Sequence, residues 1–291
     1  MSIKMRYSLA AIAAIAASVQ AHGVVSEIQG ANGVTMPGLS VQDGTPRNCA
    51  SPLCGSEADT SIIRTREMGG KASALGRTQG GGAVDAGAAI SMFMGGAGAG
   101  AGAGAAAGAK RGFLDALTGG GAGAGGAGAA SAGTKSTGTE GGVAKAAGTG
   151  ATSGLPTTAD DGTITMTFHQ VNQDGAGPLT AQIDATSAGT DPAAFQDATV
   201  MQNVPGIGIG GLSAAAVKDF PVKVQMPAGM TCSGTAGGAT NVCIVRMQNA
   251  ALAGPFGGSA AFTQSTAAKK RAVEYNLRKR HMARGILGKP E

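Results

Sequence analysis

The chain has 291 residues, including 52 Gly but no Trp and only 2 Tyr, and 13% of its residues are charged. Glycine and alanine bring little side-chain area to offset the entropy of ordering, so much of this length cannot belong to a packed core. After residue 19 no apolar stretch is long enough to cross a bilayer as a helix. The composition therefore predicts no membrane span in the remaining chain.

The formal net charge of +5 is unevenly distributed. Residues 269–291 hold eight Lys or Arg against two Glu, whereas residues 22–268 carry a net charge of −3. Nucleic-acid recognition requires a basic face on the folded part of a protein, so an acidic body predicts no nucleic-acid partner. We expect residues 267–291 to form a solvated basic tail, either disordered or helical.

Residues 1–21 have the pattern of a secretory signal peptide. A short basic start precedes an apolar run over 9–19, and the small residue Ala21 stands before the expected cleavage site. We therefore expect a secreted protein, extracellular or cell-wall associated, whose mature chain begins at His22. A terminal histidine offers a metal both its α-amine and its imidazole, a chelate that no internal histidine can form. The plain alternative is that some residue must follow the cleavage site.

Four cysteines remain in the mature chain, and an even count in a secreted protein predicts two disulfides. We predict the local pairs Cys49–Cys54 and Cys232–Cys243, because each pair brackets turn-forming residues. A zinc site is the weaker alternative, since neither spacing is the CxxC that zinc sites use.

The remaining chain divides by composition into three parts before the tail. Residues 22–94 and 155–266 are mixed and rich in turn-formers, and we expect them to be the two halves of one folded unit. Residues 95–154 are almost wholly Gly, Ala, Ser and Thr, which predicts a long, flexible Gly/Ala-rich insert between the halves.

Strand patterns are clearest after residue 160. Residues 163–171 alternate with period two, so that Met166 and Phe168 face one way and His169 the other. Four further strands are expected, at 179–183, 199–204, 220–226 and 242–248. Short strands at regular spacing predict an all-β fold, specifically an antiparallel β-sandwich of the immunoglobulin or fibronectin type. The only expected helix lies at 267–284.

Three histidines are present, of which His281 lies in the basic tail and is expected to be exposed. His22 and His169 together could supply three nitrogens, namely the α-amine and one ring nitrogen from each imidazole. Such a donor set suits Cu(II), so we predict one copper ion held by His22 and His169. The α-amine must lose its proton to bind, so the site weakens as pH falls. The alternative reading makes His169 an ordinary polar residue of a strand surface.

Five longer motifs carry a family resemblance. They are 44–49 (GTPRNC), 58–64 (ADTSIIR), 75–79 (LGRTQ), 168–178 (FHQVNQDGAGP) and 253–258 (AGPFGG). They resemble the secreted fungal virulence-factor family of Egh-type haustorial and appressorial penetration proteins. The resemblance covers about residues 22–94 and 155–264, and it implies a secreted fungal protein associated with host penetration. Asp59 and Arg64 within these motifs are candidates for a buried ion pair.

A mature chain that opens His-Gly, with a second histidine on a β-sandwich strand, also resembles the histidine brace of lytic polysaccharide monooxygenases. This resemblance implies copper at His22 and His169 and oxidation of cell-wall glycans. Those enzymes place Tyr or Phe at the axial copper position, and Phe256 and Phe262 are the candidates here. Gln264 is a candidate polar group beside the metal. No catalytic residue is assigned beyond the metal ligands.

The low aromatic content argues against polysaccharide oxidation. Polysaccharide-binding faces stack sugar rings on exposed aromatics, and the body of this chain has neither Trp nor Tyr. A non-catalytic, secreted or wall-associated structural or binding protein involved in host-surface penetration is therefore the alternative function. We expect a monomer whose partners are cell-wall polysaccharide or the host surface.

Overall fold

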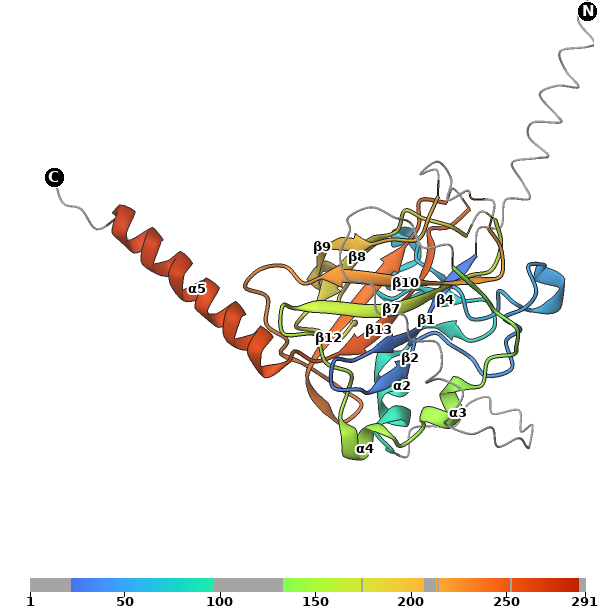
Figure 1. Ribbon diagram of the computed structural model, residues 1–291, viewed down its shortest axis with the longest axis horizontal. Coiled ribbons are helices and arrows are strands. Elements are labelled where there is room, and N and C mark those ends of the chain that lie inside the picture. The colour runs from blue at the N-terminus through green and yellow to red at the C-terminus, as the bar shows by residue number, and fades with distance from the viewer. Residues whose placement is uncertain are drawn as a thin grey trace, which may run out of the picture.

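The structure is a computed structural model (Figure 1), and the residues it describes are 22–96, 133–173, 175–206, 213, 215–251 and 253–287. The predicted signal peptide and residues 97–132 of the predicted insert lie outside this description.

Most of the secondary structure is β. The strands are β1 (Gly23–Gln29), β2 (Thr35–Pro37), β3 (Ser61–Ile62), β4 (Arg77–Thr78), β5 (Gly82–Ala83), β6 (Thr134–Lys135), β7 (Thr163–Gln170), β8 (Thr180–Asp184), β9 (Phe195–Gln202), β10 (Lys218–Gln225), β11 (Gly234–Ala236), β12 (Ala239–Gln248) and β13 (Phe256–Phe262). The helices are α2 (Ala86–Phe93), α3 (Gly142–Ala146), α4 (Gly150–Ser153) and α5 (Thr266–Leu287), with short 3₁₀ turns at Pro52–Cys54, Thr65–Glu67 and Pro192–Ala194.

The strands pair antiparallel in the order β2-β1-β7-β10-β9-β8-β12-β13-β3-β4-β5. This sheet curls until β13 packs against β1 (Figure 1). Just past β2, the main-chain N–H of Leu39 donates to the carbonyl of Ser259 on β13 at 2.8 Å. A Cβ placed on Gly258 would lie 2.6 Å from the main-chain nitrogen of Val25, so the two strands touch directly. The all-β antiparallel prediction is confirmed, while the immunoglobulin or fibronectin type stays a prediction.

The core lies inside the curl and follows the predicted alternation. On β7 the side chains of Met166 and Phe168 are buried, and β10 places Val222 and Phe220 directly opposite them. Paired apolar residues on one face stabilise a sheet by burying area between strands. The four further predicted strands correspond to β8, β9, β10 and β12, with boundaries shifted by a few residues.

Several elements lie outside the predicted strands and helix, and β13 and α2 show why. Strand β13 has the sequence FGGSAAF, and all seven residues are buried. A strand covered on both faces shows no polar alternation, so its pattern is hidden. Helix α2 is short, and Asp85 caps its start by accepting a hydrogen bond from Ala88 N at 3.0 Å. Ile90 on this helix is fully buried, which anchors it to the core.

The predicted flexible insert is wrong in its second part, because residues 133–154 are folded. Strand β6 pairs with β10, and the main-chain N–H of Arg47 donates to the carbonyl of Gly138 at 2.8 Å. Asp43 accepts hydrogen bonds from the first N–H groups of α3. The segment lacks large apolar side chains, so composition suggested disorder, whereas main-chain and polar contacts hold it.

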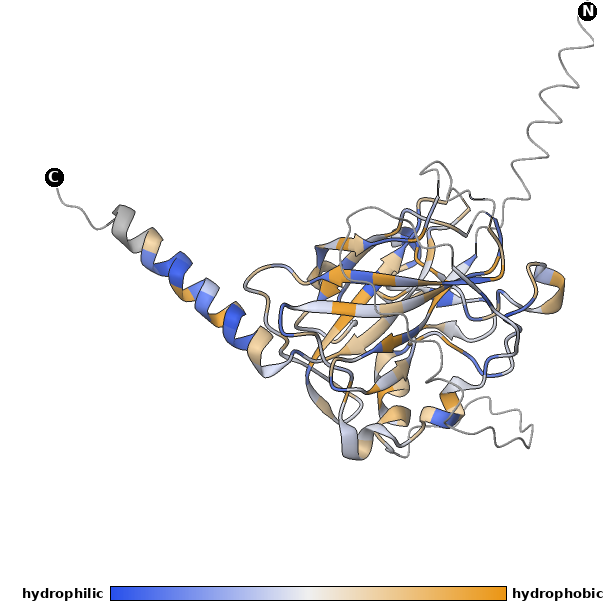
Figure 2. Ribbon diagram, viewed as in Figure 1, coloured by the Kyte–Doolittle hydropathy of each residue, from blue (hydrophilic) through white to orange (hydrophobic). Residues whose placement is uncertain are grey.

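The basic tail is helical in its described part. The side chains of Ala268 and Ala272 are buried, and Asn276 donates to the carbonyl of Gly229 at 2.8 Å. Beyond these contacts α5 extends away from the sheet (Figure 1), with hydrophilic residues along much of its length (Figure 2). Within the described ranges, no helix combines the length and apolarity needed to cross a membrane.

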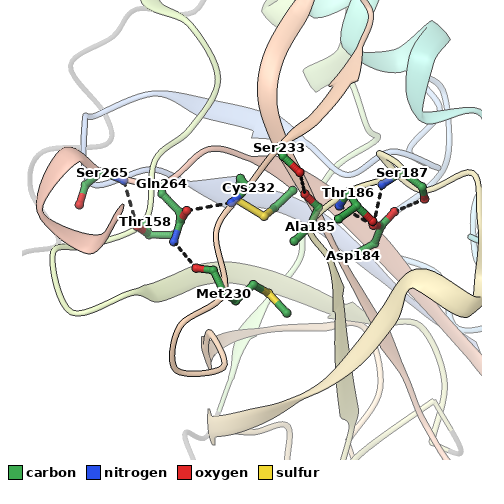
Figure 3. Close-up of a disulfide and its surroundings, with 11 residues drawn as sticks. Thr158, Asp184, Ala185, Thr186, Ser187, Met230, Cys232, Ser233, Gln264 and Ser265 are labelled. Carbon is green, nitrogen blue, oxygen red and sulfur yellow. Dashed lines mark hydrogen bonds between the residues drawn. A yellow bond between two sulfur atoms is a disulfide. The ribbon is translucent and has the colours of Figure 1, made fainter. Parts of the chain in front are cut away.

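Both predicted disulfides, Cys49–Cys54 and Cys232–Cys243, are formed. Figure 3 shows the second one beside Gln264. The Gln264 side chain accepts from Cys232 N at 2.9 Å and donates to the carbonyl of Met230 at 2.9 Å. Gln264 therefore fastens this loop to the residues that precede α5.

Candidate metal centre

Strand pairing brings His22 and His169 to one face of the sheet. Val24 on β1 lies directly opposite His169 on β7, so these two residues share a face. The carbonyl of His22 accepts from Val171 N at 3.0 Å, which continues the ladder beyond the end of β1. Alternate residues of a strand share a face, so His22 lies on the same face as Val24 and diagonally adjacent to His169.

Both imidazoles are buried, and their nitrogens are poorly satisfied. His22 is 2% exposed and His169 is 0% exposed. Within the described structure, His22 Nδ1, His22 Nε2 and His169 Nε2 have no hydrogen-bond partner. Buried polar atoms without partners are costly and rare in folded proteins. A metal ion at this face would take one ring nitrogen from each imidazole, because the two nitrogens of one ring point in opposite directions and cannot bind the same ion.

The other nitrogen of His169 is firmly held. Nδ1 lies 2.7 Å from Oδ1 of Asp219, the residue opposite His169 on β10, and 3.1 Å from the hydroxyl of Ser136. Ser136 in turn donates to Oδ2 of Asp219 at 2.6 Å. A carboxylate on Nδ1 keeps the proton there and leaves the lone pair on Nε2, the arrangement usual for histidine ligands of metals.

The electrostatics of Asp219 agree with this assignment. Burial by itself raises the pKa of Asp219, but the hydrogen bonds from His169 and Ser136 and the neighbouring positive charges outweigh it. The pKa of Asp219 therefore lies below its ordinary value, and the group is a carboxylate that accepts the Nδ1 proton.

His22 is held through its main chain and by its surroundings. Its main-chain nitrogen donates to Oδ1 of Asn172 at 2.8 Å, and Nδ2 of Asn172 donates to Oε1 of Glu57 at 3.1 Å. The same Glu57 oxygen lies 3.1 Å from His22 Nδ1, within ion-pair distance but not aligned for a hydrogen bond. The ring of Phe256 packs at 4.3 Å between centroids and 39° to the imidazole plane.

Of the three residues suggested as axial or neighbouring groups, the structure brings only Phe256 to the histidines. Phe262 ends β13 and is buried in the main core opposite Cys243. Gln264 lies at the Cys232–Cys243 disulfide, where both ends of its amide are used. His281 is exposed on α5, as expected from its place in the tail.

The alternative reading made His169 an ordinary residue of a strand surface, whereas it is completely buried. The folded segment around Ser136 covers it, and this segment is fastened by Arg47. Arg47 forms a bidentate pair with Asp59, with Nη1–Oδ1 at 3.0 Å and Nη2–Oδ2 at 2.5 Å, and also binds Glu140 at 3.0 Å through Nε. The predicted pair of Asp59 with Arg64 is therefore wrong.

Arg64 does not pair with Asp59, because its guanidinium has other partners. Its guanidinium binds Glu67 at 3.0 Å and the carbonyls of Ala253 and Gly254.

Beside the Arg47 network runs an open groove of about 590 Å³, whose polar walls include Glu27, Glu140, Lys145, Thr167 and Asp219. The groove therefore borders the carboxylate that holds His169.

Four residues of this centre were not singled out as site residues from the sequence: Glu57, Ser136, Asn172 and Asp219. Asn172 lies three residues after His169 in the motif 168–178 and could have been suspected from its position. Ser136 lay in the segment expected to be flexible, and Asp219 reaches His169 only through strand register. Neither carries a local signal.

The nitrogen donors at this centre are the two imidazoles and the main-chain nitrogen of His22. Across the described ranges, no group of three or more His, Cys, Asp or Glu side chains is arranged to hold a metal. A brace needs only two imidazoles and the α-amine at His22, whose nitrogen already has a polar partner in Asn172. The residues present therefore fit the donor set that was predicted.

Relatives of the chain are fungal virulence factors. The family model described as Egh16-like virulence factor matches residues 20–257. The chain is 59% identical over 285 residues to the appressoria-specific virulence factor GAS2 of Pyricularia oryzae, which covers 97% of each protein. It is 39% identical over 122 residues to the appressoria-specific virulence factor GAS1 of that fungus, covering 40% of this chain and 47% of the relative. No solved structure matches the chain. This chain belongs to the Egh16-like virulence factor family.

Proposed function

We propose that this chain is a secreted fungal protein of host penetration that binds one copper ion and oxidises cell-wall glycans. Its copper ligands are the α-amine and imidazole of His22 and Nε2 of His169. Family membership and two disulfides support secretion and a role in penetration. Copper binding is the more specific part of the proposal and rests on separate observations.

The observation that supports copper binding is that Nδ1 of His22 and Nε2 of His169 are buried on one face without hydrogen-bond partners. Nitrogen donors favour copper over hard cations such as calcium or magnesium, which prefer oxygen. Asp219 and Ser136 hold the Nδ1 side of His169, so its Nε2 is free to bind. Asn172 accepts a hydrogen bond from the nitrogen that becomes the α-amine after cleavage.

When bound at such a site, copper supplies one-electron redox chemistry toward oxygen or peroxide. The protein residues would position and shield the centre. Phe256 covers one side of the His22 ring, and Asp219 keeps a proton at Nδ1 of His169. The polar groove bordering Asp219 is a candidate site for a sugar chain.

A second candidate is a copper-binding protein without turnover, and burial favours it. With exposed fractions of 2% and 0%, the two imidazoles offer a polymer no direct approach. The body also has no exposed aromatic platform, because it contains neither Trp nor Tyr. These facts support a structural or binding role in penetration as the alternative to oxidation.

Copper binding is tested with protein that begins at His22. The protein is titrated with Cu(II) against a competing chelator, and its EPR spectrum is recorded. We expect an axial signal and an affinity that falls at least about a hundredfold in His169→Ala, with no change in the control His281→Ala. A protein that retains Ala21 before His22 lacks the α-amine and should bind similarly weakly. Weak binding that is the same in all four proteins would overturn the proposal.

Turnover is tested separately on plant and fungal wall glycans with a reductant and peroxide. Oxidised soluble fragments that require His169 would establish the enzyme. Tight copper binding without such fragments would leave the non-catalytic role.

A further inference from the structure

We propose that the exposed length of α5 is a docking arm for an acidic polysaccharide. This goes beyond the proposed copper chemistry and concerns the opposite end of the molecule. Only the choice of a polysaccharide rests on the secretion stated above, because the charge argument holds in any compartment.

The arm is attached to the body at its start. Ala268 and Ala272 are buried against the body, and Asn276 donates to the carbonyl of Gly229. The hydroxyl of Ser265 donates to Asp160 at 2.9 Å just before the helix begins. Since the first turns are fixed, the helix presents its later turns in a defined direction from the sheet (Figure 1).

Six basic side chains are exposed along this helix, and they form two triplets. The triplets are Lys269, Lys270, Arg271 and Arg278, Lys279, Arg280. Among the described residues, none of the six forms an ion pair within 4.0 Å, and the same stretch holds one acidic residue, Glu274. Unpaired clustered cations attract polyanions, especially at low ionic strength.

The spacing of the triplets favours a polymer over a small anion. Arg271 of the first triplet and Arg278 of the second are seven positions apart, so they share a face of the helix and lie about 10 Å apart along its axis. A single small anion could contact only one triplet, whereas a chain of carboxylates could contact both. Two sites engaged together also bind much more tightly than either alone.

The distribution of charge around the helix argues against a membrane. Successive residues of a triplet lie about 100° apart, so each triplet surrounds most of the helix. A helix that lies in a bilayer interface needs one continuous apolar face and a separate polar face. Val273, Tyr275 and Leu277 are about half exposed but are interrupted by charged residues, so the helix has no such face over its described side chains, up to residue 282.

Nucleic acid is a poorer occupant than an acidic polysaccharide. The body from residue 22 to 268 has a net charge of −3 and would repel any long polyanion that crossed it, so secretion rather than charge selects between the two polymers. A projecting arm lets an acidic polymer bind without contacting that body. Carboxylated sugar chains are the polyanions that a secreted, disulfide-bonded protein would meet in a cell wall.

The test compares two variants that change net charge equally. In the arm variant Arg278, Lys279 and Arg280 are replaced by Glu, and in the control variant three exposed body cations, Arg66, Lys71 and Lys223, are replaced by Glu. Binding of the mature full-length protein to polygalacturonate is measured at about 50 and 300 mM salt. We expect an affinity loss of about tenfold for the arm variant and less than about twofold for the control, with wild-type binding weakened by salt.

Each other outcome overturns the inference. Equal losses in both variants would mean attraction by net charge alone, and no loss in either would remove the arm from binding. Tighter binding to phosphatidylserine vesicles or to single-stranded RNA than to polygalacturonate would assign another partner. Circular dichroism confirms that the arm variant keeps its helix. Copper affinity, measured on the same variants, should not change, so this inference and the copper proposal can fail independently.

Discussion

Strand β13 runs between two regions that differ in how their polar groups are satisfied. At its start, Phe256 packs on His22, where imidazole nitrogens are buried without hydrogen-bond partners. Beyond its end, Gln264 satisfies main-chain groups of Cys232 and Met230 with both ends of its amide, and α5 then exposes its charges to solvent. We refer to these as the histidine end and the helix end. Unpaired buried nitrogens suit an ion, whereas exposed cations suit a polymer.

The two ends also differ in what stabilises them. At the histidine end, Arg47 binds two carboxylates and holds down the segment that covers His169. At the helix end, a disulfide between Cys232 and Cys243 and the Gln264 contacts hold the loop (Figure 3). Because ion pairs and disulfides respond differently to substitution, variants at the two ends should have separable effects.

Removing Arg47 should cause the largest loss. Arg47→Ala leaves Asp59, which is fully buried, without its bidentate partner. We expect the free energy of unfolding to fall by about 3–5 kcal/mol in urea titrations, because an uncompensated buried charge remains. The exposed Arg66→Ala is the control and should change it by less than about 0.5 kcal/mol. A loss of the same size in both variants would show that the ion pair does not stabilise this end.

Removing the disulfide at the helix end should cost slightly less. Cys232 and Cys243 are 11 residues apart, so replacing both with Ser should lower the free energy of unfolding by about 3 kcal/mol through loop entropy. Copper affinity should stay within about twofold of wild type, since the histidine centre uses other residues. If copper affinity fell together with stability, the two ends would be coupled and the comparison would fail.

Asp219→Asn should act on the histidine end alone. Asn cannot serve as the anionic acceptor for Nδ1 of His169, so copper affinity should fall about 10–100-fold in a chelator competition. Asp197→Asn on β9 removes an exposed carboxylate and is the matched control. The free energy of unfolding without copper should change by much less than the free energy of copper binding. If Asp219 had only a structural role, the free energy of unfolding would fall while copper affinity stayed the same.

The smallest expected effect is on the pH dependence of the free energy of unfolding at the helix end. Burial by itself raises the pKa of Asp184, but hydrogen bonds from Ser187, Thr186 and Gly189 outweigh it and hold the pKa below its ordinary value (Figure 3). The stabilisation is therefore present above the unfolded pKa of about 3.9 and lost as pH falls through the lower folded value. Asp184→Asn should flatten the decline in unfolding free energy between about pH 5 and pH 2. An unchanged slope would contradict this assignment.

The sequence predicted features with local signals. Period-two alternation identified β7 and β10, and turn-formers between cysteines identified both disulfides. His22 and His169 were paired by their scarcity and expected terminus, and strand register places them on one face. In each case the determining residues lie within about ten positions of one another or are rare residue types.

The parts that could not be predicted depend on long-range packing. Strand β13 has no alternation because both its faces are covered, and Ser136 sits in a stretch whose composition indicates disorder. Asp219 reaches His169 only because β10 pairs with β7 in one particular register. Single-sequence patterns carry no record of register between distant strands.

Gly258 on β13 sets how closely strand β1 approaches β13. The main chain of β1 occupies the place where a side chain at 258 would begin, since Val25 N lies 2.6 Å from that position. A single added methyl group would force β1 outward and carry His22 with it, three residues from the contact. Under the proposed copper binding, alanine at position 258 would therefore weaken the site even with both histidines in place.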